Sequence, residues 1–251
     1  AADVTESGTT TEEQTADSQE TTEVTEEEKP SLVDETLAGM TLHEKVCQMM
    51  FVTPEELTGE DGVTVAGDAT RQALENYPVG GIVYFAKNLE SQDQVKEMID
   101  NSQKYSSIGL FVATDEEGGV VNRLMDTVGT TYIGSMYYYK DDGDETAYEN
   151  AYTIANDMSA LGFNLDFAPV ADVWSNPDNT VIGERAYSDD YAQAAELVGN
   201  AVKGFNDGGV MCTLKHFPGH GDTAEDSHYS SAYVHRTKEE IMADEMQPFR
   251  S

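Results

Sequence analysis

The sequence predicts an α/β fold with a parallel sheet, because short apolar segments alternate with amphipathic ones. Strands that are apolar on both faces and separated by helices indicate parallel pairing, with helices covering the sheet. Polar residues directly follow several of these segments, an arrangement that (β/α) barrels and open doubly wound sheets share. Five such strands are expected, the first less clearly marked than the rest, at 49–53, 80–86, 109–114, 163–168 and 210–214.

Helices are expected between the strands, where apolar residues recur every three or four positions. The first begins at the capping box Thr41–Glu44, and the last begins at the capping box Thr237–Glu240. Gly162 is expected to end one of the helices between them. The pattern of residues 125–146 predicts a long loop, and long loops beside an active face are usually functional. The remaining helices are expected at 91–105, 146–161 and 189–206.

The charge of the chain excludes some classes of partner. Its 251 residues include 48 Asp and Glu against 14 Lys and Arg, which gives a formal net charge of −34. Phosphate backbones and anionic lipid surfaces are repelled by such a polyanion, so the sequence predicts no nucleic-acid partner. No apolar run approaches the roughly 18 residues of a spanning helix, so no membrane span is expected. A neutral or cationic small molecule is the ligand class that fits best.

The first 30 residues differ in composition from the rest. They contain 10 acidic residues and one Lys, but no aromatic residue and no Leu, Ile or Met. Such a segment cannot bury enough apolar surface to offset its ordering entropy, so 1–30 are expected to be a disordered Thr/Glu-rich tether before a folded domain at 31–251. The tether resembles the spacer that follows the lipidated cysteine of bacterial surface lipoproteins. This resemblance implies an extracytoplasmic, cell-surface or secreted protein with a possible lipid anchor, provided that a leader has been removed.

The two cysteines are expected to be separate buried thiols. Cys47 and Cys212 lie far apart in the sequence, each within an apolar segment. Buried free Cys behaves as a small apolar residue, and no CxxC or comparable zinc spacing occurs.

The residues most suited to chemistry lie in 215–228, KHFPGHGDTAEDSH, directly after the last expected strand. Three of the five His residues of the chain fall here. The Pro-Gly break excludes a helix, so His216 and His220 do not form a helical metal pair. One interpretation is a metal site built from His216, His220, His228 and an Asp. The other is a proton-transfer dyad of Asp226 and His228, and the spacing alone leaves both open.

The dyad has a clear physical basis. In an extended loop, residues two apart point to the same face. The Asp226 carboxylate can therefore hold one imidazole nitrogen of His228, which leaves the other to act as a general acid near neutral pH.

Residues 215–228 resemble the signature of glycoside hydrolase family 3 enzymes of the NagZ-like β-N-acetylglucosaminidase type. Three further segments resemble family motifs and occur in the family's order: ATDEEGGVVNRL at 113–124, LGFNLDFAPVADV at 161–173 and NTVIGERAY at 179–187. The resemblance covers most of residues 40–250. It implies a (β/α)8 TIM-type barrel, of which this chain carries about five strands.

The resemblance also implies an activity. It implies an exo-acting retaining β-N-acetylhexosaminidase that removes terminal β-linked N-acetylglucosamine from peptidoglycan or chitin-type fragments. The implied partner is thus a carbohydrate, and neither a metal nor an organic cofactor is implied.

Individual roles follow from the same resemblance. His228 is similar to the family's acid/base and Asp226 to its partner. Lys215 and His216 resemble residues that hydrogen-bond the sugar hydroxyls.

Three further residues match substrate-binding positions. Asp115 resembles the residue that holds the hydroxyls of the terminal sugar, and Arg123 and Arg185 resemble substrate-binding arginines. The structural alternative for each of these three is a buried salt bridge at a strand end.

The sequence departs from the family pattern in two ways. Val120 stands where the family usually has Arg after the two glycines of the EGG motif. The family's nucleophilic Asp, at the end of a later strand, has no match here, although retaining glycosidases need two groups flanking the bond. We therefore expect the 251-residue chain to have negligible turnover by itself, with an unpaired fifth strand and an exposed core.

Three alternatives remain open at this point. The first is a truncated or non-catalytic sugar-binding barrel. The second is a metal-dependent hydrolase that uses the His cluster. The third is a phosphorylase within the family, because a His acid/base tolerates an anionic acceptor better than a carboxylate does.

Overall fold

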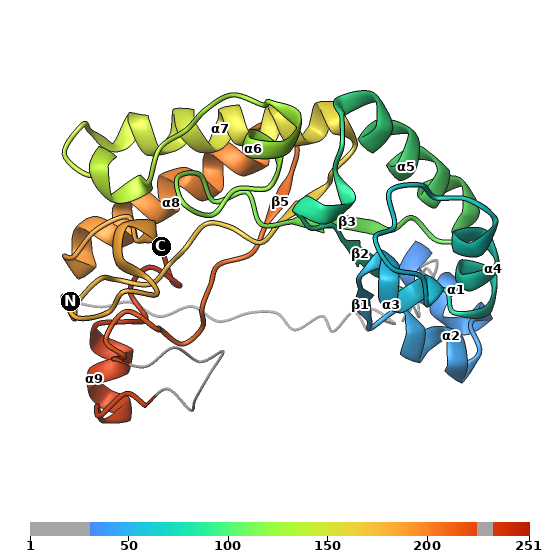
Figure 1. Ribbon diagram of the computed structural model, residues 1–251. Coiled ribbons are helices and arrows are strands. Elements are labelled where there is room, and N and C mark those ends of the chain that lie inside the picture. Colours follow the sequence, from blue (N-terminus) through green and yellow to red (C-terminus); the bar gives the residue numbers. More distant parts are fainter. Residues whose placement is uncertain (1–30, 225–232) are drawn as a thin grey trace, which may run out of the picture. The chain divides into compact units, whose positions relative to one another are not determined.

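The computed structural model describes residues 31–224 and 233–251, and these form one five-stranded parallel sheet (Figure 1). The strands pair in chain order, each parallel to the next. This order has no reversal point, so it matches consecutive strands of a (β/α) barrel and not an open doubly wound sheet. The expected α/β fold with five parallel strands is confirmed. The strands are β1 (Phe51–Val52), β2 (Gly81–Val83), β3 (Phe111–Thr114), β4 (Leu165–Asp166) and β5 (Met211–Cys212).

The regular strands are shorter than the apolar segments that predicted them. The expected strand at 163–168 contributes only the two residues of β4. Hydrogen bonding nevertheless continues past the regular part, because the Thr213 N–H donates to the Ala168 carbonyl at 2.8 Å. A further parallel bridge joins Val170 to Lys215. A run of apolar residues indicates a segment that is buried on both faces. Here the buried segments are longer than the stretches of regular strand pairing, so the predicted strands were too long.

The second folded feature is the set of helices between the strands. Both expected capping boxes are present, at α2 and α9. The helices expected at 91–105, 146–161 and 189–206 are α5, α7 and α8. The helices are α2 (Leu42–Cys47), α3 (Pro54–Thr58), α4 (Asp68–Asn76), α5 (Gln92–Tyr105), α6 (Leu124–Val128), α7 (Asp144–Leu161), α8 (Tyr191–Asp207) and α9 (Lys238–Ala243), with 3₁₀ turns η1 (Ala86–Asn88), η2 (Met136–Tyr139) and η3 (Gly183–Arg185).

The prediction of a continuous loop over 125–146 was wrong in part. Helix α6 covers the start of that segment, and η2 lies within it. The reason is tertiary, because a buried carboxylate from another part of the chain caps α6, as described below. Helices α3 and α4 were also not predicted.

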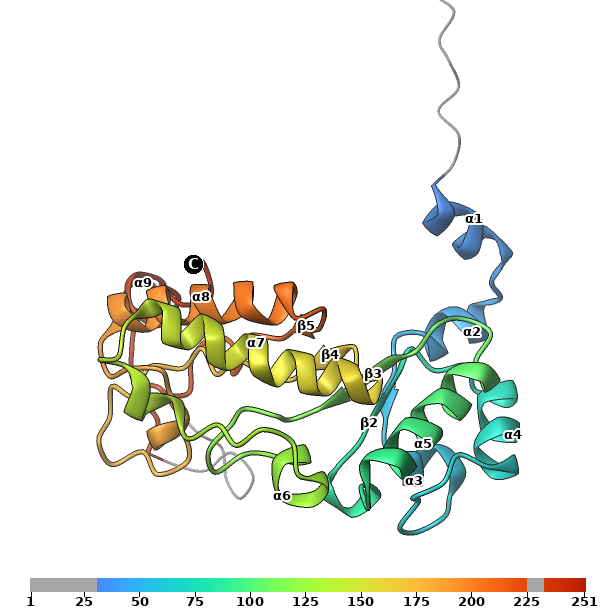
Figure 2. The same cartoon turned by 90° about the horizontal axis from the view of Figure 1, so that it is seen from above.

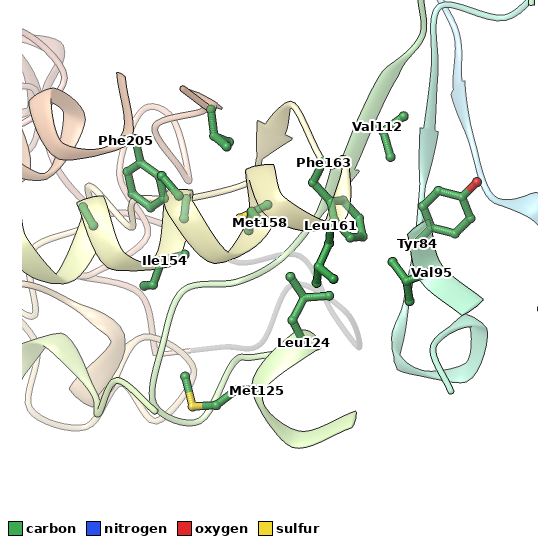
Figure 3. Packing of buried hydrophobic residues seen from close by; sticks show 14 of the residues in the cluster. Tyr84, Val95, Val112, Leu124, Met125, Ile154, Met158, Leu161, Phe163 and Phe205 are labelled. Atoms are coloured by element: carbon green, nitrogen blue, oxygen red, sulfur yellow. The ribbon is translucent and has the colours of Figure 1, made fainter. Parts of the chain in front are cut away.

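The core lies where the strands meet the helices that cover them (Figures 1 and 2). Tyr84, Val112 and Phe163 are at most 2% exposed, and the Tyr84 and Phe163 rings meet edge to face with centroids 6.1 Å apart (Figure 3). Helices α7 and α8 approach closely at Gly204, where an added Cβ would lie 2.3 Å from the Tyr148 carbonyl oxygen. Gly162 ends α7 in the left-handed region, with φ of 99°, as predicted.

An apolar groove runs along the open side of the sheet. Phe51 and Phe111 are each 41% exposed, and their rings stack with centroids 5.7 Å apart. Within the described residues, β5 pairs only with β4. Among the described residues, the sheet thus presents exposed apolar side chains along this groove. The groove has a volume of about 510 Å³ and is lined by Phe51, Phe111, Leu165, Val202, Asn206, Met211, Cys212, Leu214 and Ser251.

The chain divides into two compact units, one up to Gly39 and one from Met40 to Ser251. Of the first unit, the structure describes the helix α1 (Leu32–Gly39), which has no buried residue. In the described part of the chain, no helix combines the length and apolarity needed to span a bilayer.

Candidate active site

The predicted site residues meet at the carboxyl ends of the strands. Asp115 directly follows β3, and Lys215 follows β5 by three residues. Because the carboxyl ends of parallel strands share one edge, residues far apart in sequence can come together there. The Lys215 Nζ lies 2.8 Å from Asp115 Oδ1, across a sequence separation of 100 residues.

Lys215 belongs to a chain of alternating charges. Its ammonium also lies 2.5 Å from Glu117 Oε1. Glu117 in turn accepts two hydrogen bonds from Arg185, from Nε and Nη2, each at 2.8 Å. The Glu117 side chain is 4% exposed, and those of Lys215 and Arg185 are each 14% exposed. One network of nearly buried, alternating charges therefore runs through Asp115, Lys215, Glu117 and Arg185.

Glu117 lies in the polar segment that was expected to be functional after β3, but the sequence assigned it no individual role. Burial alone would raise its pKa, but hydrogen bonding from Arg185 and the charges of Lys215 and Arg185 outweigh burial and lower its pKa below the ordinary value. The carboxylate is therefore ionised at neutral pH and holds both cations in place. The available signal was its position two residues after Asp115, in the motif that follows β3.

Arg123 lies beside this network without closing it. Its Nη2 is 4.0 Å from Asp115 Oδ2, and its side chain is 29% exposed. The buried Arg123 Nε has no hydrogen-bond partner among the described residues. Asp115 therefore pairs closely with Lys215 through Oδ1, while its Oδ2 is held only loosely and can accept hydrogen bonds from a ligand.

Glu116 explains both the position of Arg123 and the presence of α6. Its buried carboxylate accepts the backbone N–H groups of Arg123 at 2.6 Å, Leu124 at 2.8 Å and Met125 at 3.1 Å. These are donors at the helix N-terminus that no residue within the helix can satisfy. Burial raises the pKa of Glu116, although the three hydrogen bonds oppose that shift.

Asp166 holds the start of the same loop through a hydrogen bond. Its Oδ1 accepts the Glu116 N–H at 2.9 Å, and the residue is fully buried. Oδ2 has no partner within the part of the chain that is described. Burial raises the pKa of Asp166 well above its ordinary value.

His216 is fixed by the buried carboxylate of Asp172. Asp172 Oδ2 lies 2.6 Å from His216 Nδ1 and accepts the His216 N–H at 3.1 Å, while Oδ1 accepts the His220 N–H at 2.6 Å. An ionised carboxylate only accepts, so Nδ1 carries the proton and Nε2 of the neutral ring is left as an acceptor. Asp172 is a second residue to which sequence reasoning assigned no role in the site.

His220 shapes the loop after β5. Its Nδ1 lies 2.6 Å from Thr223 Oγ1, and its carbonyl accepts the Asn179 side-chain N–H at 2.7 Å. Asn179 Oδ1 also accepts the N–H groups of Val181 and Ile182, each at 2.9 Å. The loops after β4 and β5 are thus bound to one another, and Arg185 lies just beyond this junction.

The predicted dyad lies outside the described residues, because Asp226 and His228 fall within 225–232. The roles assigned to them stay predictions. Among residues 31–224 and 233–251, no group of three His, Cys, Asp or Glu side chains is placed to hold a metal ion. Val120, where the family usually has Arg, is 62% exposed, so this departure does not alter the packing of the site.

The arrangement suits a neutral polyhydroxylated ligand. Lys215 uses two of its three N–H groups on Asp115 and Glu117, which leaves one donor free of those two partners. Asp115 Oδ2 and His216 Nε2 supply acceptors nearby. A sugar hydroxyl both donates and accepts, so alternating donors and acceptors match a ring that carries several of them.

Comparison with known proteins identifies the family to which the chain is similar. Residues 41–251 match the family described as "Glycosyl hydrolase family 3 N terminal domain". Beta-hexosaminidase A of Pseudoalteromonas piscicida is 36% identical over 186 residues, which cover 71% of this chain and 31% of that protein. A glycoside hydrolase family 3 β-N-acetylglucosaminidase from Paenibacillus sp. str. FPU-7 has a TM-score of 0.75 at 38% identity, covering 84% of this chain and 39% of that one.

A third similar protein was solved with a ligand. NagZ from Neisseria gonorrhoeae, in complex with N-trifluoroacetyl-D-glucosamine, has a TM-score of 0.70 at 28% identity. The match covers 80% of this chain and 59% of that one. This chain therefore spans between about a third and three fifths of the length of the proteins that it matches. Because the family match extends over nearly all of the second unit, and the relatives agree with it, this chain belongs to glycosyl hydrolase family 3.

Proposed function

We propose that the protein containing this chain is an exo-acting retaining β-N-acetylhexosaminidase. Its substrate would be a terminal β-linked N-acetylglucosamine on a peptidoglycan or chitin-type fragment. The observation that carries the proposal is the network of Asp115, Lys215, Glu117 and Arg185 beside the fixed ring of His216. The names of the similar proteins, which are a beta-hexosaminidase and a β-N-acetylglucosaminidase, support the sugar class.

The proposed binding mode uses the hydrogen-bond donors and acceptors that the network leaves available. Asp115 Oδ2 accepts hydroxyl protons of the terminal sugar, Lys215 donates its remaining N–H, and His216 Nε2 accepts another hydroxyl proton. Glu117 makes no sugar contact in this proposal, because both of its oxygens are engaged by Arg185 and Lys215. It holds the two cations at a fixed distance from Asp115. Such preorganised charges need not rearrange when the sugar binds.

The proposed chemistry assigns proton transfer to the dyad. His228, oriented by Asp226, protonates the leaving oxygen in the first step and removes a proton from water in the second. A retaining enzyme also needs a nucleophile on the opposite side of the bond. The resemblance assigns that role to no residue of this chain.

The activity test uses the natural protein that contains this sequence, with 4-nitrophenyl N-acetyl-β-D-glucosaminide as substrate. We expect turnover that falls by about 100-fold or more in His228→Ala, because a positioned general acid contributes about 10²- to 10⁴-fold. His235→Ala is the matched control, since His235 is exposed and matches no family position. Equal activity in wild type and His228→Ala would refute the assignment of the acid/base.

The same assay separates the alternatives. Loss of activity with a chelator would favour a metal-dependent hydrolase, whereas the proposed mechanism predicts no effect. Acceleration by inorganic phosphate would indicate a phosphorylase. Binding of N-acetylglucosamine in calorimetry without any turnover would indicate a sugar-binding module. Whichever of these activities the protein has, Asp115→Ala should weaken the binding of N-acetylglucosamine by more than about tenfold, because it removes a charged hydrogen-bond partner.

A further inference from the structure

We propose that Tyr137, Tyr138 and Trp174 form an aromatic platform that binds the second sugar of a β-linked N-acetylglucosamine oligomer. This inference rests on the proposed function, because it extends the same site beyond the terminal sugar. Tyr137 and Tyr138 lie in η2, and Trp174 lies in the loop after β4. The Tyr137 ring meets the Trp174 ring edge to face with centroids 5.0 Å apart, and it meets the Tyr138 ring at 6.2 Å.

Two residues of the platform, Tyr137 and Trp174, contact neighbouring side chains that hold them in place. The Tyr137 hydroxyl donates to Asp189 Oδ2 at 3.0 Å, and Lys140 Nζ donates to Asp189 Oδ1 at 2.6 Å. The same ammonium lies 4.2 Å from the centroid of the Tyr137 ring. Trp174 packs against the buried side chains of Val170, Ile182 and Ala186. A surface whose side chains are already ordered has less conformational entropy to lose when it binds a ligand.

The platform is linked to both halves of the candidate active site through neighbouring residues of the chain. A hydrogen bond with Glu184 raises the pKa of the Tyr138 hydroxyl, and Glu184 immediately precedes Arg185 of the charge network. Trp174 follows Asp172, the residue that fixes His216, by two positions, which span at most about 7 Å of chain. The aromatic residues therefore lie in segments that are directly joined, along the chain or by a hydrogen bond, to those that supply Arg185 and Asp172.

The chemistry of the platform fits a pyranose ring. Isolated exposed aromatic residues are common and need no explanation. Here, however, the Tyr138 side chain is 70% exposed while one edge contacts a second ring and its hydroxyl is bonded. A pyranose has an apolar face of C–H groups and a polar edge of hydroxyls. Tyr and Trp provide large amphipathic contact areas with few rotatable bonds, so they complement such a face.

The test compares one sugar with two. Calorimetry on the natural protein that contains this sequence, in a His228→Ala background to prevent hydrolysis, measures the affinity for N-acetylglucosamine and for N,N′-diacetylchitobiose. We expect the disaccharide to bind more tightly than the monosaccharide. Tyr138→Ala should weaken disaccharide binding by about twofold to tenfold, the range for one aromatic stacking contact, and leave monosaccharide binding unchanged.

Two control variants separate stacking from other effects. Tyr138→Phe keeps the ring and removes the hydroxyl, so disaccharide binding should stay within about twofold of the parent. Tyr132→Ala removes another exposed tyrosine, 76% exposed and located between α6 and η2, and should change neither affinity.

The outcomes distinguish this inference from the proposed function. The platform is refuted if Tyr138→Ala leaves disaccharide binding intact, weakens both sugars equally, or does no more than Tyr132→Ala. A protein that binds N-acetylglucosamine but gains nothing from the second sugar retains the proposed function and loses the platform. A protein that binds neither sugar loses both.

Discussion

Replacing Glu117 by Gln should destabilise the fold by about 3 kcal/mol, because it removes the carboxylate that bridges two nearly buried cations. Glu117 accepts two hydrogen bonds of 2.8 Å from Arg185 and lies 2.5 Å from Lys215. Removing one partner of a buried ion pair costs about 3–5 kcal/mol. We expect the lower end of that range, because Arg185 and Lys215 remain 14% exposed and Lys215 keeps Asp115 as a second partner.

The assay is urea unfolding of the 251-residue chain, followed by circular dichroism at several pH values. Glu75→Gln is the matched control, because Glu75 pairs with Arg71 at 3.3 Å on the exposed side of α4. Exposed pairs of this kind contribute little, so the control should unfold at the wild-type midpoint.

The pH dependence supplies an independent check of the sign. The pKa of Glu117 is lowered in the folded state from an ordinary value of 4.5. The ionised carboxylate therefore stabilises the fold at pH values above 4.5, and this contribution is lost as the pH falls through the lower, folded-state pKa. The difference between wild type and Glu117→Gln should be largest near pH 7 and shrink below pH 4.5. If Glu117→Gln and Glu75→Gln unfold at the same urea concentration, the network contributes no stability and the reasoning fails.

Two further predictions follow from Asp172 and from the thiols. Asp172→Asn should weaken N-acetylglucosamine binding by about tenfold in calorimetry, because asparagine keeps only one of the two oxygens that hold His216 and His220. Asp178→Asn, at an exposed position, is the control. An unchanged affinity in Asp172→Asn would contradict the role given to Asp172. Cys212 should react with iodoacetamide far more slowly in the native chain at pH 8 than in urea, because burial, assisted by the nearby Asp166, raises its pKa to about 11. Mass spectrometry measures both rates, and equal rates would show that the thiol is exposed.

The fold was largely accessible from the sequence because its signals are local. Parallel strands covered by helices are apolar on both faces, so each of the five strands left a run of apolar residues. The capping boxes at α2 and α9 involve residues three apart, and Gly162 ends α7 through its own backbone preference. Each of these features depends on neighbours in the chain, so no tertiary information was needed.

The site was accessible only in part, because its contacts are long-range. Asp115, Lys215 and Arg185 were predicted from motifs. In the structure Lys215 meets Asp115 across 100 residues, and Arg185 meets Glu117 across 68 residues. Glu117 received no role because a carboxylate beside two other carboxylates in the sequence gives no sign of which one is buried between cations. The dyad of Asp226 and His228 stays a prediction.

Helix α6 shows the same limit within the fold. Its five residues carry no capping signal of their own, and residue Arg123 at its N-terminus makes no side-chain cap. The two carboxylate oxygens of Glu116, which follows β3, accept three backbone N–H groups instead, and Asp166 of β4 accepts the Glu116 N–H in turn. A helix capped from a neighbouring strand cannot be found by local periodicity.

The amino-acid order alone thus established the class of fold, the positions of its strands along the chain and the family motifs that mark their carboxyl ends, because apolar periodicity and short motifs are properties of adjacent residues. The pairing of charges around Lys215, the fixing of His216 by Asp172 and the platform at Tyr138 required the folded chain. Each of these features depends on which polar groups are buried next to one another, and only the tertiary structure brings those groups into contact.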